Sequence, residues 1–296
     1  MPPAQWGPLD ANISMLFTEV PMLERPAAAA AAGFTAVEAW WPFGAAVPGD
    51  AEVTAFEQAV RDAGVQLVAL NGFAGDMPAG ERGILSWPGR QQEFLDNLDV
   101  LLGIGARLDC RRFNLLYGSR IEDAPAGAVG GGAVGGDAAQ DELALENLTV
   151  AARAARRAGA AVMLEPLSAL PQYPLHTSAD VLGVLNQLPA DCADAARLLA
   201  DLYHLRVNGE DIPAMLDRVH TRIGHVQVAD VPGRHEPGTG TADLDGWVAA
   251  LRGLGYQGWI GLEYAPLEST AAGLGRLGLG RLDQGSGARP SPGQQS

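Results

Sequence analysis

Short apolar runs alternate with longer segments of helical spacing along most of the chain. Runs rich in β-branched and aliphatic residues occur at residues 11–15, 36–40, 65–70, 112–117, 161–165, 198–201, 223–228 and 259–263. Between them lie Ala-, Leu- and Arg-rich stretches, such as 145–158 and 241–254, whose apolar residues recur with the period of a helix. This alternation is typical of βα units around a parallel sheet. Eight such units in 296 residues predict an α/β protein with a single (β/α)8 TIM barrel.

A doubly wound sheet is the alternative arrangement of such units. When it holds a nucleotide, it normally carries a glycine-rich turn after its first strand. Here the first predicted strand is followed by Leu16-Phe17-Thr18-Glu19, which contains no glycine. The pattern therefore favours the barrel, and we expect its catalytic domain to span residues 9–273.

Two segments lack the apolar residues that would anchor them to such a barrel. Residues 124–140, APAGAVGGGAVGGDAAQ, form a Gly- and Ala-rich insertion, and residues 274–296 are rich in Gly, Pro, Ser and Gln. Segments of this composition cannot bury enough surface to offset the entropy lost on ordering. We expect a poorly ordered insertion and a disordered tail.

Charge and cysteine content exclude several classes of function. The formal net charge of −15 opposes binding to nucleic acid or to an anionic membrane, because such binding depends on clustered Lys and Arg. The only two cysteines, Cys110 and Cys192, form neither a CxxC motif nor a disulfide framework, which favours the cytoplasm. No apolar run reaches the length of about 18 residues that spans a bilayer. The expected partners are a small-molecule substrate and, in a homo-oligomer, further copies of the chain.

Four consecutive predicted strands end in an oxygen-bearing side chain. The reactive groups of a TIM barrel lie at the C-terminal ends of its strands. These ends carry Glu165 in VMLEP, Asp201 in LLADLYH, Gln227 in HVQVAD and Glu263 in IGLEY. Because side chains alternate along a strand, Gln227 shares its face with His225, for which we expect a structural hydrogen bond deeper in the barrel.

A divalent cation would solve the electrostatic problem that these residues create. Three carboxylates and an amide gathered at one barrel mouth would repel one another and lose solvation, at a cost of several kcal/mol per unpaired ion. An all-oxygen set suits Mg²⁺ or Mn²⁺ better than Zn²⁺, which favours His and Cys. The alternative is that each acid caps a helix or pairs with an arginine. The metal ligands predicted from the pattern are Glu165, Asp201, Gln227 and Glu263.

Together with their surroundings, these residues resemble the hydroxypyruvate isomerases of the xylose isomerase-like TIM barrel superfamily. The resemblance extends over the stretches ANISMLF, FTAVEAWWPF, AGDMPAGERGILSWPGR, DLYH and PGRHEPGTG, in family order from about residue 9 to 273. The chain departs from the pattern at the Gly-rich insertion, at Thr241-Ala242 after EPGTG, and around residues 173–176. These departures concern substrate contacts more than the metal site.

The resemblance implies the interconversion of hydroxypyruvate and 2-hydroxy-3-oxopropanoate (tartronate semialdehyde). A cation held by the substrate oxygens would stabilise an enediolate. Two carboxylates would move the proton between C3 and C2, and by resemblance these are Glu165 and Glu263, which also serve as metal ligands. The chain is thus expected to be an aldose-ketose type isomerase.

Five further residues are candidate substrate contacts. Arg234 offers a planar fork that matches a carboxylate, and His204 could donate a hydrogen bond to a substrate oxygen or be satisfied by backbone. Arg82 is a second anion-binding candidate, unless it pairs with Glu81 or Glu93. The remaining two end the second and third predicted strands and either line the pocket or bond to neighbouring loops: Glu38 and Asn71.

Three other functions compete with this interpretation. A related sugar or oxo-acid isomerase or epimerase, such as a 2-oxo-tetronate isomerase or a ketohexose 3-epimerase, would use the same catalytic machinery on another substrate. An endonuclease IV-like enzyme would need a histidine-rich zinc cluster, which five histidines and the negative charge disfavour. A catalytically silent binding protein could retain the barrel, although the presence of both Glu165 and Glu263 argues against it.

Overall fold

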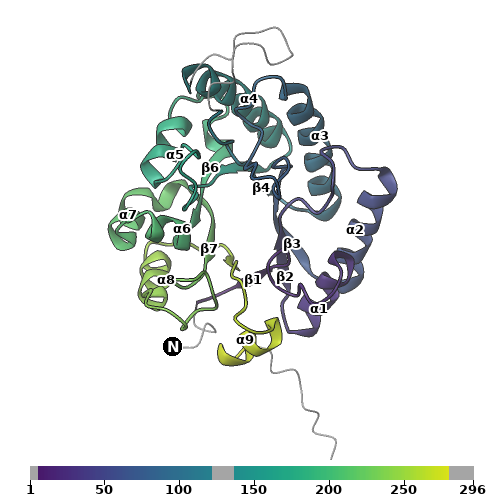
Figure 1. Ribbon diagram of the computed structural model, residues 1–296, viewed down its shortest axis with the longest axis vertical. Coiled ribbons are helices and arrows are strands. Elements are labelled where there is room, and N and C mark those ends of the chain that lie inside the picture. The colour runs from purple at the N-terminus through teal and green to yellow at the C-terminus, as the bar shows by residue number, and fades with distance from the viewer. Residues whose placement is uncertain (1–5, 122–136, 280–296) are drawn as a thin grey trace, which may run out of the picture.

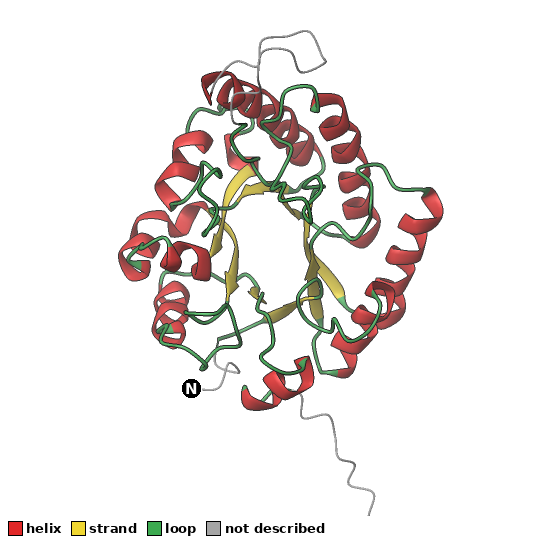
Figure 2. Ribbon diagram, viewed as in Figure 1, coloured by secondary structure: helices red, strands yellow, loops and turns green. Residues whose placement is uncertain are grey.

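The fold is a closed barrel of eight parallel strands surrounded by helices. It is seen in a computed structural model that describes residues 6–121 and 137–279. The strands follow one another around the ring in chain order, and the last pairs with the first. Figure 2 shows the strands as a central ring with the helices outside it. The predicted TIM barrel is confirmed.

The eight strands occupy the predicted regions, but several are shorter than expected. They are β1 Leu9–Asn12, β2 Ala36–Ala39, β3 Gln66–Asn71, β4 Arg112–Asn114, β5 Ala161–Leu164, β6 Ala196–Asp201, β7 Ile223–Val228 and β8 Ile260–Leu262. The first strand was predicted at residues 11–15, but Asn12 ends it. The side-chain Oδ1 of Asn12 accepts a hydrogen bond from the Ser14 amide at 3.0 Å, and its carbonyl accepts one from the Leu16 amide at 2.8 Å. These bonds turn the chain out of the sheet.

Helices connect the strands on the outside of the barrel (Figure 1). The α-helices are α1 Arg25–Ala31, α2 Asp50–Ala63, α3 Gln91–Leu108, α4 Asp137–Arg157, α5 Ser178–Leu185, α6 Leu202–Val207, α7 Ile212–Val219, α8 Leu244–Gly253 and α9 Thr270–Arg276. Their apolar faces and the outward side chains of the strands form the main hydrophobic core. Among the described residues, none of the helices combines the length and apolar character needed to cross a membrane.

The structure modifies the expected limits of the two poorly ordered segments. Of the predicted insertion at 124–140, residues 137–140 form the first turn of α4, because the buried Gln140 accepts from the Ile121 amide and donates to the Ser119 carbonyl. Of the predicted tail at 274–296, residues 274–276 complete α9. Residues 122–136 and 280–296 lie outside the described part of the chain.

Helix α9 connects the loops that follow β1 and β7. The Thr270 side chain at its start accepts a hydrogen bond from the Phe17 amide at 2.7 Å, and the Thr270 amide donates to Glu19 at 2.6 Å. At its other end, Arg276 forms an ion pair with Glu236, whose side chain is fully buried. Glu236 belongs to the EPGTG stretch. The last helix therefore supports two loops at the C-terminal end of the barrel.

Candidate active site

A cavity of about 280 Å³ opens at the C-terminal end of the barrel. Its lining includes six of the residues predicted from the sequence, namely Asn71, Arg82, Glu165, His204, Arg234 and Glu263. A larger depression of about 730 Å³ lies beside α4 and α5, away from the strand ends. The strand-end cavity is the candidate active site, because it alone of these two adjoins the buried carboxylates at the barrel mouth.

Three buried carboxylates, those of Glu165, Asp201 and Glu263, come together at the strand ends below this cavity. Glu165 and Glu263 line the cavity itself. One ligand atom from each of Glu165, Asp201 and His204 lies within 4.8 Å of the others. Glu165 and Glu263 stand one residue beyond β5 and β8, whereas Asp201 is the last residue of β6. The structure thus gathers the acids that the strand-end pattern predicted.

Gln227, which is paired with Asp201 across β6 and β7, has one specific amide orientation. Its Nε2 donates to Glu38 Oε1 at 2.9 Å, and its buried Oε1 has no hydrogen-bond partner. A carboxylate accepts hydrogen bonds only, so Glu38 requires the NH₂ group on its side and leaves the oxygen directed away from it. His225 Nε2 lies 2.8 Å from the other oxygen of Glu38, which provides the structural hydrogen bond expected for this histidine.

The donor atoms fit a divalent cation. Two buried oxygens, Gln227 Oε1 and Glu263 Oε2, lack hydrogen-bond partners, although such atoms are costly to leave unpaired. Asp201 and Gln227 are paired across β6 and β7, so their side chains leave neighbouring strands at one level. The carboxylate and histidine groups could therefore hold a metal ion here, and carboxylate and amide oxygens are the donors that Mg²⁺ and Mn²⁺ prefer.

Burial changes the protonation of the catalytic candidates. Desolvation, with a contribution from Asp201, raises the pKa of Glu165 to about 8. Desolvation also raises the pKa of Glu263 well above its usual value, although the nearby Arg234 opposes this shift. The pKa of His204 falls to about 4, chiefly through burial, so its ring is neutral near pH 7. Glu165 is therefore poised to accept and release a proton near neutral pH, and burial favours the protonated form of Glu263 through its raised pKa.

The tautomer of His204 follows from its contacts. Its Nδ1 lies 3.0 Å from the Ser168 amide, which can only donate, so Nδ1 accepts and Nε2 carries the proton. Nε2 is 3.5 Å from Asp201 Oδ2, and the histidine lines the cavity. The neutral ring can thus present an N–H donor at the cavity floor. For His204, the alternative to substrate binding was a contact with backbone. That contact, with the Ser168 amide, involves Nδ1 and not Nε2.

Arg234 contacts the carboxylates directly. Its Nη2 donates to Glu263 Oε1 at 2.8 Å and to Asp201 Oδ2 at 3.3 Å, while its Nε has no partner. We expected this side chain to contact the substrate carboxylate. It does line the cavity, but its guanidinium is engaged by two predicted metal ligands.

The backbone of the loop after β7 fixes the position of Arg234. Arg234 adopts a left-handed conformation, with φ of 57°, directly after Gly233 with φ of 101°. The Asp230 side chain accepts hydrogen bonds from the amides of Val231, Gly238 and Ala242 at 2.7–3.1 Å. A positive φ at a residue other than glycine costs free energy and persists only where the surroundings impose it. These bonds explain how the Pro- and Gly-rich loop holds one conformation.

Arg82 lies in the cavity wall and not in a surface ion pair. The alternative partners, Glu81 and Glu93, both pair with Arg90, at 2.7 and 2.6 Å. Arg82 Nη1 instead donates to the carbonyls of Met77 and Glu81. The adjacent Gly83 has φ of 104°, and a Cβ there would lie 2.0 Å from the Leu116 carbonyl oxygen. Only glycine fits this turn, which accounts for the second glycine of GERG.

The two strand-end candidates Glu38 and Asn71 have different positions. Asn71, the last residue of β3, lines the cavity. Glu38 does not belong to its lining, because its carboxylate is directed into the barrel toward Asn12, His225 and Gln227. The prediction that Glu38 contacts the substrate is therefore wrong, and Glu38 contacts Gln227 instead.

Two site residues were not predicted from the sequence. Asn114 Nδ2 donates to Glu165 Oε2 at 2.6 Å, and Trp40 Nε1 donates to Glu263 Oε1 at 3.1 Å. Asn114 ends β4, but the apolar run was extended to residue 117, so the strand-end criterion was applied at the wrong position. Trp40 directly follows β2, and nothing in its local sequence distinguishes it from a core tryptophan.

Several known proteins are similar to this chain over most of its length. A putative hydroxypyruvate isomerase of Streptomyces coelicolor is 46% identical over 88% of this chain and 91% of its own length. A 2-oxo-tetronate isomerase of Cupriavidus necator is 35% identical over 90% and 96% of the two chains. The solved structure described as AP endonuclease, family 2, from Brucella melitensis has a TM-score of 0.80 and 31% identity, covering 94% of this chain and 98% of its own.

The relatives named above confirm the prediction of an isomerase. The family described as Xylose isomerase-like TIM barrel matches residues 26–278, which include every residue of the candidate site. The match agrees with the closed eight-stranded barrel. By sequence and by architecture, this chain belongs to the xylose isomerase-like TIM barrel family.

Proposed function

We propose that the protein interconverts hydroxypyruvate and 2-hydroxy-3-oxopropanoate. The observation that carries the proposal is the position of Glu165 and Glu263, two buried glutamates with raised pKa values that line one small cavity. They follow β5 and β8, which are separated around the ring by two strands, so they approach a substrate from different directions. The relative with 46% identity, named a putative hydroxypyruvate isomerase, supports the choice of substrate.

The residues that would hold a cofactor are Glu165, Asp201, Gln227 and Glu263. Their all-oxygen donor set favours Mg²⁺ or Mn²⁺. Such an ion, when bound, supplies Lewis-acid stabilisation of the negative charge that develops on the substrate oxygens. Gln227 adds a ligand oxygen without a further negative charge, which limits repulsion among the three carboxylates.

The two glutamates move the proton. In the forward direction, one carboxylate removes a proton from C3 of hydroxypyruvate, and the other delivers a proton to C2 of the resulting enediolate. A proton also passes from the C3 hydroxyl oxygen to the C2 oxygen, so the product holds an aldehyde at C3 and a hydroxyl at C2. The neutral His204 donates its Nε2 proton in a hydrogen bond to a substrate oxygen. In the reverse direction the glutamates exchange roles.

Arg234 and Arg82 bind the substrate carboxylate in this proposal. Both line the cavity, and Arg234 keeps an unpaired Nε beside its two carboxylate contacts. A guanidinium matches a carboxylate with two parallel hydrogen bonds, which a lysine cannot reproduce. Asn71 supplies an amide at the cavity wall for a hydroxyl or carbonyl oxygen.

Proton NMR in D₂O tests the proposal directly. The purified protein with Mg²⁺ should incorporate deuterium from solvent into hydroxypyruvate and form an aldehyde product. Glu165→Gln and Glu263→Gln should each reduce the rate by about 10²–10⁴-fold, the usual contribution of a general acid or base. Glu57→Gln, at a buried ion pair of α2, is the matched control and should retain the rate. Full activity in either catalytic variant would refute the two-glutamate mechanism.

The second candidate is a 2-oxo-tetronate isomerase, because the relative with that name is 35% identical over 90% of the chain. A panel of hydroxypyruvate, four-carbon oxo acids and ketohexoses distinguishes the two, and turnover of ketohexoses alone would favour an epimerase. A nuclease is disfavoured, since the strand ends at the barrel mouth bring together one histidine and three carboxylates, and the formal chain charge is −15.

Cys110 and Cys192 are unpaired and buried, which supports a cytoplasmic location.

A further inference from the structure

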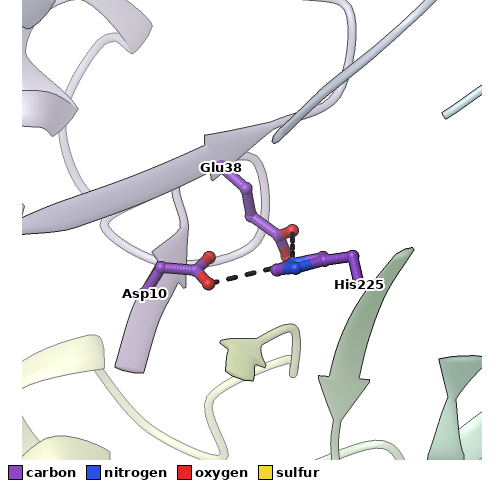
Figure 3. A group of neighbouring side chains, drawn as sticks. All are labelled: Asp10, Glu38 and His225. Carbon is purple, nitrogen blue, oxygen red and sulfur yellow. Dashed lines mark hydrogen bonds and ion pairs between the residues drawn. The ribbon is translucent and has the colours of Figure 1, made fainter. Parts of the chain in front are cut away.

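A second group of ionisable side chains lies inside the barrel. Asp10 of β1, Glu38 of β2 and His225 of β7 point toward one another (Figure 3), and we call them the inner cluster. Their exposed fractions are 0–2%. None of the three lines the strand-end cavity. The inner cluster is thus separate from the catalytic glutamates, and among the hydrogen bonds of the described residues, the one between Glu38 and Gln227 connects it to the candidate active site.

The inner cluster contains unpaired donor atoms. Both carboxylate oxygens of Asp10 and the Nδ1 of His225 are buried without a hydrogen-bond partner. Arg112 acts on Asp10 through its charge, but its Nε donates to the Gly224 carbonyl, and the two residues form no ion pair in the described part of the chain. Two carboxylates buried side by side with unpaired oxygens are unstable unless a proton or a cation compensates them.

The spacing of the donor atoms suits a small four-coordinate ion. His225 Nε2 lies 2.8 Å from Glu38 Oε2 and 3.8 Å from Asp10 Oδ2, and one atom of each residue lies within 4.8 Å of the others. Ligands of tetrahedral zinc, at about 2.1 Å from the metal, are about 3.4 Å apart. The observed separations bracket this value. The inner cluster thus offers three protein ligands, His225 Nε2 and one oxygen each of Asp10 and Glu38, the number found in zinc sites that keep a fourth position open.

Neighbouring residues leave one oxygen of Glu38 for an ion. Gly261 of β8, which is paired with Asp10, makes room for the Glu38 carboxylate, because a Cβ on Gly261 would lie 2.6 Å from Glu38 Oε1. Glu38 uses Oε1 for Gln227 and Asn12, which leaves Oε2 for an ion. We propose that the inner cluster binds a zinc ion through His225 Nε2 and the carboxylates of Asp10 and Glu38, linking strands β1, β2 and β7. His225 then carries its proton on Nδ1.

Because the inner cluster is buried, the ion must enter as the chain folds. The test therefore uses protein produced in zinc-supplemented culture, dialysed against metal-free buffer and analysed for zinc by mass spectrometry. Asp10→Asn should contain one zinc ion fewer per chain than the wild type. Glu57→Gln, which alters a buried carboxylate already paired with two arginines, should contain as much zinc as the wild type. This difference does not depend on whether the mouth site is filled or active.

A second variant and a second measurement keep the test decisive. Asp10→Ser replaces the carboxylate by a small hydroxyl and should lose the same zinc ion if Asp10→Asn fails to fold. Anomalous diffraction at the zinc edge from wild-type crystals should give a peak between Asp10, Glu38 and His225. Equal zinc contents in the wild type and both folded variants, or no peak at this position, would overturn the proposal and identify Asp10 as a buried carboxylic acid.

Discussion

The orientation of the Gln227 amide depends on Glu38, and the substitution Glu38→Leu tests this dependence. Glu38 Oε1 accepts from Gln227 Nε2 at 2.9 Å and from Asn12 Nδ2 at 3.1 Å. A leucine at this position offers no acceptor, so the NH₂ group of Gln227 would face an apolar side chain. A buried donor without an acceptor costs about 1–3 kcal/mol. The chain can relieve this cost by rotating the Gln227 amide, which turns its NH₂ group toward the barrel mouth.

We therefore expect weaker metal binding with little change in the chemical step. A free-energy cost of about 1.4–2.8 kcal/mol corresponds to a 10–100-fold rise in the Mn²⁺ concentration that gives half-maximal activity. This range agrees with the usual effect of removing a residue that orients a metal ligand, about 10–100-fold. The rate at saturating Mn²⁺ should change little, because Glu38 does not line the cavity.

Isomerase activity as a function of Mn²⁺ concentration provides the assay, with circular dichroism to verify folding. Asp10→Asn is the matched control, because it alters the same buried region and leaves the bond between Glu38 and Gln227 in place. An unchanged half-saturating Mn²⁺ concentration in folded Glu38→Leu would show that Glu38 does not set the amide orientation.

Two further predictions concern the cavity. Arg234→Ala should raise KM for hydroxypyruvate about 10–100-fold, as expected for the loss of about 1.5–3 kcal/mol of charge-assisted hydrogen bonding, while a metal ion still binds by calorimetry. Arg234→Lys keeps the charge without the planar fork, and a wild-type KM in Arg234→Lys would refute bidentate recognition. Because burial, with Asp201, raises the pKa of Glu165 to about 8, Mn²⁺ must displace a proton from Glu165 below that pH. The calorimetric Mn²⁺ affinity should therefore fall about tenfold per pH unit below about 8, and a constant affinity between about pH 6 and 8 would contradict the raised pKa.

The barrel and its floor were predictable because they depend on local patterns. Each strand of a TIM barrel is a short apolar run, and its last residues reach the active-site end whatever the loops do. This rule suffices to place Glu165, Asp201, Gln227 and Glu263 together. It failed for Asn114 only because the apolar run LLY continues past the end of β4. Strand ends are therefore informative only when their positions are known to within about a residue or two.

The remaining features depend on contacts across the barrel or on loop backbone. Glu38 belongs to β2 and its partners His225 and Gln227 belong to β7, and these two strands face each other only when the sheet closes. The direction of Arg234 follows from a positive φ that no residue preference would select at an arginine. Neither side-chain periodicity nor composition contains this information. These are the points at which the expected substrate contacts needed revision.

Helix α9 has a practical consequence for shortened versions of this protein. A recombinant chain ending at residue 273, the boundary suggested by composition, would remove Arg276 and leave the fully buried carboxylate of Glu236 without its ion-pair partner. Losing one partner of such an ion pair is more harmful than replacing both. Glu236 lies two residues after Arg234 in the same loop, so we expect a shortened enzyme that still folds its barrel to lose substrate affinity. Expression designs and C-terminal fusions should accordingly keep the chain through residue 279.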